Sequence, residues 1–218
     1  MSPDMLSRCF RTEESRARYW AQQAVDLCSE IEDESLTELA ELVKKAESAL
    51  DRDRRIIVMG GERCGKSTLL SAVAEYPAIA RVPLTDDYVC WRYRCKDGDS
   101  TCSRFIPMEN LSGLELVDTR SCANEGVAAT VRQLIHGADV MIAVTDGRAP
   151  EASPIWPILA SMKEEQRAAC LIAVTFTENL AAEATLKLKD SLRDYCREHL
   201  GASLPLCFVN PNSSRESL

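Results

Sequence analysis

From about residue 55 onward the chain alternates short apolar runs with longer amphipathic stretches. The apolar runs have strand length and predict strands over Ile56–Met59, Tyr88–Arg94, Leu114–Val117, Ala138–Val144, Ala169–Val174 and Leu206–Val209. The amphipathic stretches predict helices over Lys66–Glu75, Ala123–His136, Ser153–Glu165 and Leu180–Leu200. Strands that alternate with helices, the later ones apolar throughout, are typical of a mostly parallel sheet covered on both faces. The pattern therefore predicts a three-layer α/β fold.

The first 54 residues have a different character. Thr12–Leu50 contains no glycine or proline and reads as helix, with a capping-box pattern at Ser35–Glu38 that favours a break into two helices. The second helix carries an apolar stripe at three- and four-residue spacing. We therefore expect an N-terminal helical segment over residues 1–54, and an α/β domain over residues 55–218.

Composition and charge narrow the function classes. The 218 residues are 45% hydrophobic, which excludes a disordered chain, and the net charge of −8 argues against a nucleic-acid partner. No apolar run approaches the length of a membrane span. Ten cysteines occur without a Cys-x-x-Cys pair, which favours free thiols in a reducing, cytoplasmic setting.

A phosphate-binding motif follows the first predicted strand and opens the first predicted helix. Its nine residues are Gly60, Gly61, Glu62, Arg63, Cys64, Gly65, Lys66, Ser67 and Thr68. Glycines allow backbone N–H groups to surround phosphate oxygens, and the helix N-terminus adds a favourable dipole. In this motif the lysine reaches the β- and γ-phosphates, and the serine hydroxyl binds Mg²⁺. The sequence therefore predicts a nucleoside-triphosphate site.

A carboxylate at the end of a second core strand is needed to hold Mg²⁺ through water. Asp118 follows the apolar run Leu114–Val117, and Asp146 ends the next run along the chain. We favour Asp118 as the metal residue, with Asp146 as the alternative.

With these motifs in place, residues 35–210 resemble the dynamin superfamily of large GTPases, especially bacterial dynamin-like proteins. The resemblance rests on the phosphate loop followed by Thr68-Leu-Leu70, the run Gly113–Thr119, and the spacing to Ala138–Asp146. It implies a GTPase-like P-loop fold, with GTP or GDP and Mg²⁺ as ligands.

Carried over by position, the resemblance implies further roles. Thr85 would be the threonine that binds Mg²⁺ and positions the attacking water, with Thr101 as its competitor. Asp118 would open the second switch segment. Arg63 stands where the neighbouring guanylate-binding proteins carry an arginine that stabilises the transition state, and its alternative is a solvated loop side chain.

Two positions depart from the family pattern. Ser121 replaces the glycine that ends the second switch motif, and it loses the backbone freedom of glycine. The base-recognition motif is replaced by Thr175-Phe-Thr-Glu178, in which Glu178 would pair with guanine and Phe176 would cover the ring. The last base-contacting loop would begin at Asn210.

The resemblance thus implies a Mg²⁺-dependent GTPase that accelerates when two copies pair through their nucleotide faces. It also implies a cytoplasmic protein that can associate peripherally with membranes, although no lipid-binding segment is evident. The N-terminal helices would meet a partner or a C-terminal segment that residues 211–218 are too few to supply. The alternatives are a non-hydrolysing nucleotide switch that docks partners and, ranked last, a P-loop ATPase or kinase.

Overall fold

The computed structural model describes residues 53–93, 103–107, 111–178 and 180–209. The chain divides into two units, Met1–Asp53 and Arg54–Leu218, and the description below concerns the second. The expected N-terminal helices, Thr101 and Asn210 lie outside the described residues.

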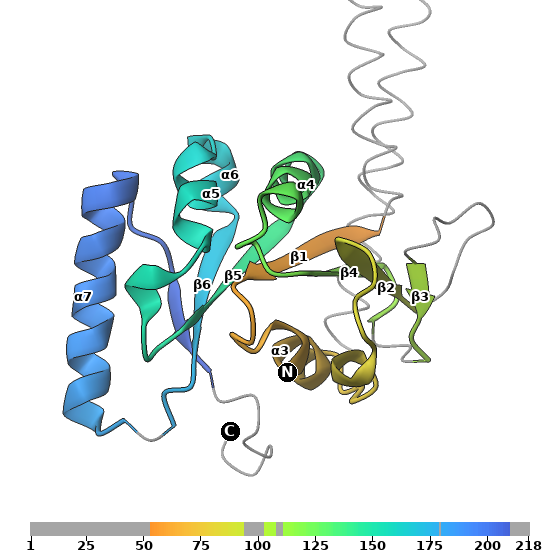
Figure 1. The fold of residues 1–218 in the computed structure, drawn as a ribbon, viewed down its shortest axis with the longest axis horizontal. Helices are drawn as coiled ribbons and strands as arrows, with labels where there is room; N and C mark the ends of the chain where they lie inside the picture. Colours follow the sequence, from red (N-terminus) through yellow and green to blue (C-terminus); the bar gives the residue numbers. More distant parts are fainter. Residues whose placement is uncertain (1–52, 94–102, 108–110, 179, 210–218) are drawn as a thin grey trace, which may run out of the picture. The chain divides into compact units, whose positions relative to one another are not determined.

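A seven-stranded sheet forms the centre of the second unit (Figure 1). Its strands are β1 (Arg54–Gly60), β2 (Tyr88–Arg92), β3 (Ser103–Phe105), β4 (Leu114–Thr119), β5 (Val140–Asp146), β6 (Cys170–Thr175) and β7 (Leu206–Phe208). They lie in the order β3-β2-β4-β1-β5-β6-β7, and the β2–β4 pair alone is antiparallel in this sheet. The predicted mostly parallel α/β sheet is confirmed.

Helices cover both faces of this sheet. The helices are α3 (Lys66–Val73), α4 (Glu125–Ile135), α5 (Ile155–Ser161), α6 (Glu164–Ala168) and α7 (Ala182–Leu200), with short 3-10 turns at Ile79–Arg81 and Pro150–Ala152. On one face, Leu69 and Leu70 of α3 pack against Val58 of β1. On the other, side chains of α4, α5 and α7 pack against Ile57 and Ile172. Figure 1 shows α3 on the opposite side of the sheet from α4 and α5. The result is a three-layer arrangement.

The predicted single helix over Ser153–Glu165 is wrong. Two helices, α5 and α6, meet at Met162, whose backbone is extended and whose side chain is buried. The N–H of Lys163 then donates to the Gln166 side chain at 2.9 Å, which caps the start of α6. Burial of Met162 and this cap stabilise the break.

Strand β3 was not predicted, and the strand predicted over Tyr88–Arg94 ends at Arg92 in the described residues. The Ser103–Phe105 backbone pairs in parallel with β2, and two of its three side chains are exposed. A short edge strand of this kind has no continuous apolar face, so its sequence carries little strand signal.

Two leucines on α7 provide a matched test of the packing. Leu192 is buried against the core and Leu186 is 60% exposed. We expect Leu192→Ala to lower the free energy of unfolding by about 3 kcal/mol, because it leaves a cavity, and Leu186→Ala to lower it by less than about 1 kcal/mol. Urea unfolding followed by circular dichroism measures both. Equal losses in the two variants would contradict this packing of α7.

Candidate functional site

The carboxyl ends of four neighbouring strands meet at one edge of the sheet. Strands β4, β1, β5 and β6 are parallel to one another, so the residues that follow them lie close together. The phosphate loop follows β1, and Asp118, Asp146 and Thr175 stand at the ends of β4, β5 and β6. The sheet therefore gathers residues that are far apart in the sequence.

The phosphate loop is shaped by close backbone contacts. A Cβ atom on Gly60 would lie 2.5 Å from the carbonyl oxygen of Val144, so only glycine fits there. Gly65 and Arg63 have φ values of 94° and 53°, which turn the chain into α3. Among the described residues, the N–H groups of residues 62–65 find no backbone acceptor. These amides are available to an anion at the N-terminus of α3.

Lys66 lies inside this loop and is only 7% exposed. Its ammonium group donates to the carbonyl oxygens of Gly61, at 2.5 Å, and Gly60, at 3.3 Å. Its hydrogen bonds thus hold a positive charge at the centre of the loop.

Asp118 is the most deeply buried acidic group among the described residues of the site. It is 1% exposed, and neither carboxylate oxygen has a hydrogen-bond partner among the described residues. Burial raises its pKa to about 6, although the nearby Ser67 hydroxyl and the charge of Lys66 act in the opposite direction. A buried carboxylate without partners is costly unless a cation or donor joins it.

The residues at this position fit a magnesium ion. The donor set is the Ser67 hydroxyl and the Asp118 carboxylate, and oxygen ligands of this kind suit Mg²⁺. Among the described residues no cluster of three or more His, Cys, Asp or Glu could enclose a metal by itself. An ion that keeps most of its water and phosphate ligands matches this sparse set.

A cavity of about 610 Å³ opens beside the loop. It is lined by Glu62, Arg63, Lys66, Ser67, Leu84, Thr119, Arg120, Ser121, Ala123, Asn124 and Val127. Of the residues predicted for catalysis, Lys66 and Arg63 line it. The Arg63 side chain is 92% exposed and lies 3.7 Å from Glu62.

Thr85 does not line this cavity. It is exposed, and its hydroxyl donates to Asp86 at 3.3 Å. Its role in metal binding and water positioning stays a prediction.

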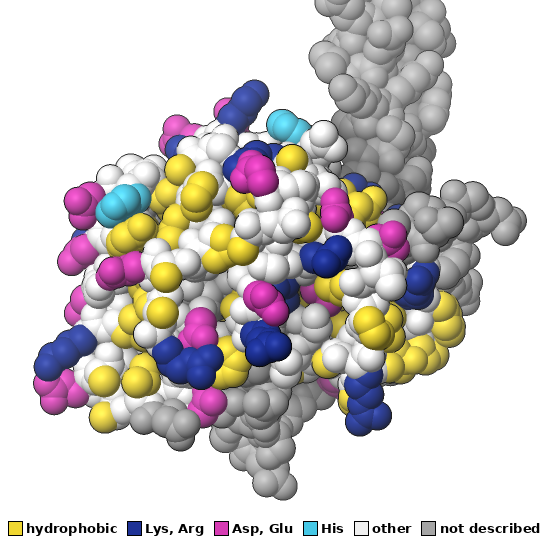
Figure 2. Space-filling view, viewed as in Figure 1, with side chains coloured by type: hydrophobic (Ala, Val, Ile, Leu, Met, Phe, Trp, Pro, Cys, Tyr) yellow, Lys and Arg dark blue, Asp and Glu magenta, His cyan; other side chains and the backbone are white. Residues whose placement is uncertain are grey.

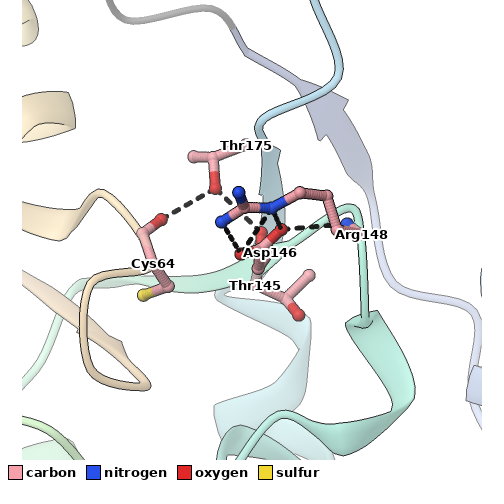
Figure 3. A network of polar contacts seen from close by, with 5 residues as sticks. All are labelled: Cys64, Thr145, Asp146, Arg148 and Thr175. Atoms are coloured by element: carbon pink, nitrogen blue, oxygen red, sulfur yellow. Dashed lines mark hydrogen bonds and ion pairs between the residues drawn. The ribbon is translucent and has the colours of Figure 1, made fainter. Parts of the chain in front are cut away.

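Thr175 attaches the end of β6 to the phosphate loop (Figure 3). Its hydroxyl lies 2.7 Å from the carbonyl oxygen of Cys64 and 3.1 Å from that of Thr145. Cys64 is itself buried, and burial raises the pKa of its thiol, so it stays protonated and fills space. The hydroxyl of Thr175 thereby joins the phosphate loop, β5 and β6.

The segment after Thr175 carries the remaining predicted residues. Phe176 has a φ of 55° and is partly buried, and Glu178 is exposed. The guanidinium of Arg148 lies over the Phe176 ring, 4.4 Å from its centroid, and is bonded to Asp146 at 2.6–3.1 Å. Asp146 is therefore paired with an arginine, in contrast to Asp118.

Sequence reasoning missed Arg148 and Arg120, which lines the cavity. Their positions in the sequence could have identified both residues, because the site lies at the carboxyl ends of the strands. Arg148 comes two residues after the end of β5, and Arg120 comes one residue after the end of β4. On the face shown in Figure 2, basic and acidic side chains are interspersed. None of the described helices combines the length and apolar character needed to cross a membrane.

Comparison with models of known protein families and with curated protein sequences finds no match. Solved structures do match. LeoA, a bacterial dynamin GTPase from ETEC, superimposes with a TM-score of 0.60 at 15% identity, over 96% of this chain and 39% of that one. A member of an oligomerised bacterial dynamin pair, described as sensing and tethering membranes, gives 0.51 at 14% identity, over 97% and 41%.

Toc33 from Arabidopsis thaliana, solved with GDP and Mg²⁺, gives a TM-score of 0.51 at 15% identity, over 83% of this chain and 79% of that one. The chain spans about two fifths of the length of the bacterial dynamins it matches. At these identities the likeness concerns the fold. The chain has a mostly parallel α/β fold that these GTPase structures share.

Proposed function

We propose that the protein binds GTP with Mg²⁺ and hydrolyses it to GDP and phosphate. The observation that carries the proposal is the Asp118 carboxylate, buried without a partner at the loop that holds Lys66 and Ser67. A divalent cation bound to a triphosphate would relieve this charge. The chain shares its fold with known GTPases, which supports guanine over other bases in the bound nucleotide.

Each residue of the loop has a distinct task in this proposal. Lys66 and the N–H groups of residues 62–65 bind phosphate oxygens, and Ser67 and Asp118 hold the metal. Bound Mg²⁺ would neutralise charge on the transferred phosphoryl group. Arg63 is long, exposed and next to the cavity, so it can reach that phosphoryl group and stabilise the charge that develops there.

The base would lie over the ends of β5 and β6. Glu178 offers two acceptor oxygens for the N1–H and 2-amino groups of guanine, and Phe176 offers an aromatic surface. Thr175 supports this assignment because its hydroxyl bonds the phosphate loop directly.

We further propose that two copies pair through their nucleotide faces, which would bring Arg63 and the cavity against a second molecule. Peripheral membrane association belongs to the same proposal, since one matching bacterial dynamin pair is described as tethering membranes. The N-terminal segment would dock a partner.

A non-hydrolysing nucleotide switch is the second candidate. It is favoured by Thr85, which is exposed and bonded to Asp86 outside the cavity, and by Ser121, whose hydroxyl accepts the N–H of Ala123 at 3.3 Å. Phosphate release measured with GTP over a range of protein concentrations separates the two candidates. GTP binding without turnover at every concentration would favour the switch.

Lys66→Ala tests nucleotide binding. We expect it to abolish GTP binding, because the loop loses its buried positive charge, while circular dichroism shows an unchanged fold. Lys187→Ala is the control, since Lys187 is exposed on α7 and pairs with Glu183. Titration with a fluorescent GTP analogue measures both. Equal affinities in the two variants would refute a phosphate site at the loop.

Arg63→Ala tests transition-state stabilisation. We expect the rate at saturating GTP to fall at least about tenfold and the dissociation constant to change less than about twofold, because the residue acts on charge that develops during transfer. Arg193→Ala on α7 is the control, an exposed arginine paired with Asp190. Single-turnover phosphate release gives the rate. An unchanged rate would show that Arg63 is a solvated loop side chain without a role in transition-state stabilisation.

Asp118→Asn tests the buried charge. Because the pKa is raised to about 6, the folded state binds more protons than the unfolded state between about pH 4 and pH 6. Stability from this group is therefore lost as pH rises through that window. Without nucleotide, we expect the free energy of unfolding of Asp118→Asn to exceed that of the wild type by roughly 3 kcal/mol near neutral pH and to match it below about pH 4.

Urea unfolding near pH 4 and near pH 7.5 measures this difference. With GTP present, Mg²⁺ should raise the melting temperature of the wild type and leave that of Asp118→Asn unchanged. Equal stabilisation of both proteins by Mg²⁺ would contradict the proposal that Asp118 holds the metal.

A further inference from the structure

Arg148 is held in one orientation at the end of β5. Its Nε and Nη2 atoms bond to the Asp146 carboxylate at 2.6–3.1 Å, and its backbone N–H bonds to the same side chain at 2.9 Å (Figure 3). Its guanidinium also covers the Phe176 ring at 4.4 Å. This double restraint limits the orientations of a side chain that is 66% exposed.

The position of Arg148 is tied to the phosphate loop by two hydrogen bonds. The N–H of Gly147 donates to the carbonyl oxygen of Thr175 at 2.8 Å, and the hydroxyl of Thr175 lies 2.7 Å from the carbonyl oxygen of Cys64. A nucleoside whose phosphates lie on the loop and whose base crosses the ends of β5 and β6 would therefore meet Arg148.

One end of the guanidinium remains available. Within the described residues, Nη1 of Arg148 has no hydrogen-bond acceptor, and the Glu178 carboxylate has no donor. Glu178 comes two residues after Phe176, whose ring the Arg148 guanidinium covers at 4.4 Å, so the two side chains belong to the same corner of the fold. In keeping with this placement, the pKa of Arg148 is raised chiefly by Asp146 and further by the charge of Glu178. The pair thus offers a hydrogen-bond donor beside two acceptors.

This pattern of one donor beside two acceptors is the one that cytosine presents to guanine. Guanine has an O6 acceptor next to the N1–H and 2-amino donors, so O6 would face Arg148 and the donors would face Glu178. Adenine has an amino donor at position six, which would oppose the guanidinium. The arrangement therefore discriminates between the two purines.

We propose that Arg148 is a specificity-determining residue that recognises the six-position oxygen of guanine. The inference rests on the proposed GTP binding and extends it to a residue outside the base-recognition motif. Asp146 acts as a positioning residue, because its carboxylate orients the guanidinium toward the base.

Nucleotide analogues test the assignment on the full chain. The dissociation constants of GTP, ITP, ATP and 2-aminopurine riboside triphosphate, which lacks O6, are measured for wild type and Arg148→Ala. We expect the variant to bind GTP and ITP about ten- to a hundredfold more weakly, since both lose a charged hydrogen bond. It should bind 2-aminopurine riboside triphosphate as the wild type does.

Two further variants make the readout specific. Arg193→Ala should leave all four affinities unchanged, and Asp146→Asn should weaken GTP binding less than Arg148→Ala while also sparing the 2-aminopurine analogue. Equal loss for GTP and the 2-aminopurine analogue in Arg148→Ala would overturn the inference, because it would indicate a structural role. Retention of full GTP preference would overturn it as well.

The outcomes separate this inference from the proposed function. If the wild type binds no guanine nucleotide, the proposed function fails and the inference fails with it. If the wild type prefers GTP and Arg148→Ala keeps that preference, the inference alone fails.

Discussion

The parallel pairing of β1 with β4 on one side and β5 on the other is the constraint on which the site depends. Parallel strands all end at one edge, so the phosphate loop, Asp118 and Asp146 become neighbours although Asp146 comes 86 positions after Gly60. The helices that connect these strands pack on both faces and bury the apolar runs. No local sequence feature could gather these groups without that pairing.

Within the site, two buried charges are treated differently by the fold. The Lys66 ammonium group is satisfied by two carbonyl oxygens of the loop, while the Asp118 carboxylate is left without a partner in the described residues. The fold thus keeps the cationic group ready at low cost and concentrates the unfavourable energy on one carboxylate. A site built in this way gives up stability at one carboxylate, and the cation of the proposed function would restore it.

The sequence allowed the layer architecture and the phosphate loop to be predicted because both follow from local patterns. The apolar strand β1 ends at Gly60 and the helix α3 begins at Lys66, with the glycine-containing loop between them, as the motif predicts. What escaped prediction depends on tertiary contacts. The break between α5 and α6 follows from burial of the Met162 side chain, and β3 forms by pairing with β2. Arg148 becomes a candidate for base recognition only because the fold places its guanidinium over the Phe176 ring. None of these partners is close in sequence.

Gly147 has a consequence for the thermodynamics of ligand binding. A Cβ atom there would lie 2.7 Å from the Thr177 side chain and 2.9 Å from the carbonyl oxygen of Thr175, so the loops after β5 and β6 touch through bare backbone. The N–H of Gly147 also donates to the carbonyl oxygen of Thr175 at 2.8 Å, so the two loops are joined to each other in the folded protein. A ligand that engages both loops therefore meets a preorganised surface, and the entropy of arranging it is lost during folding instead of during association.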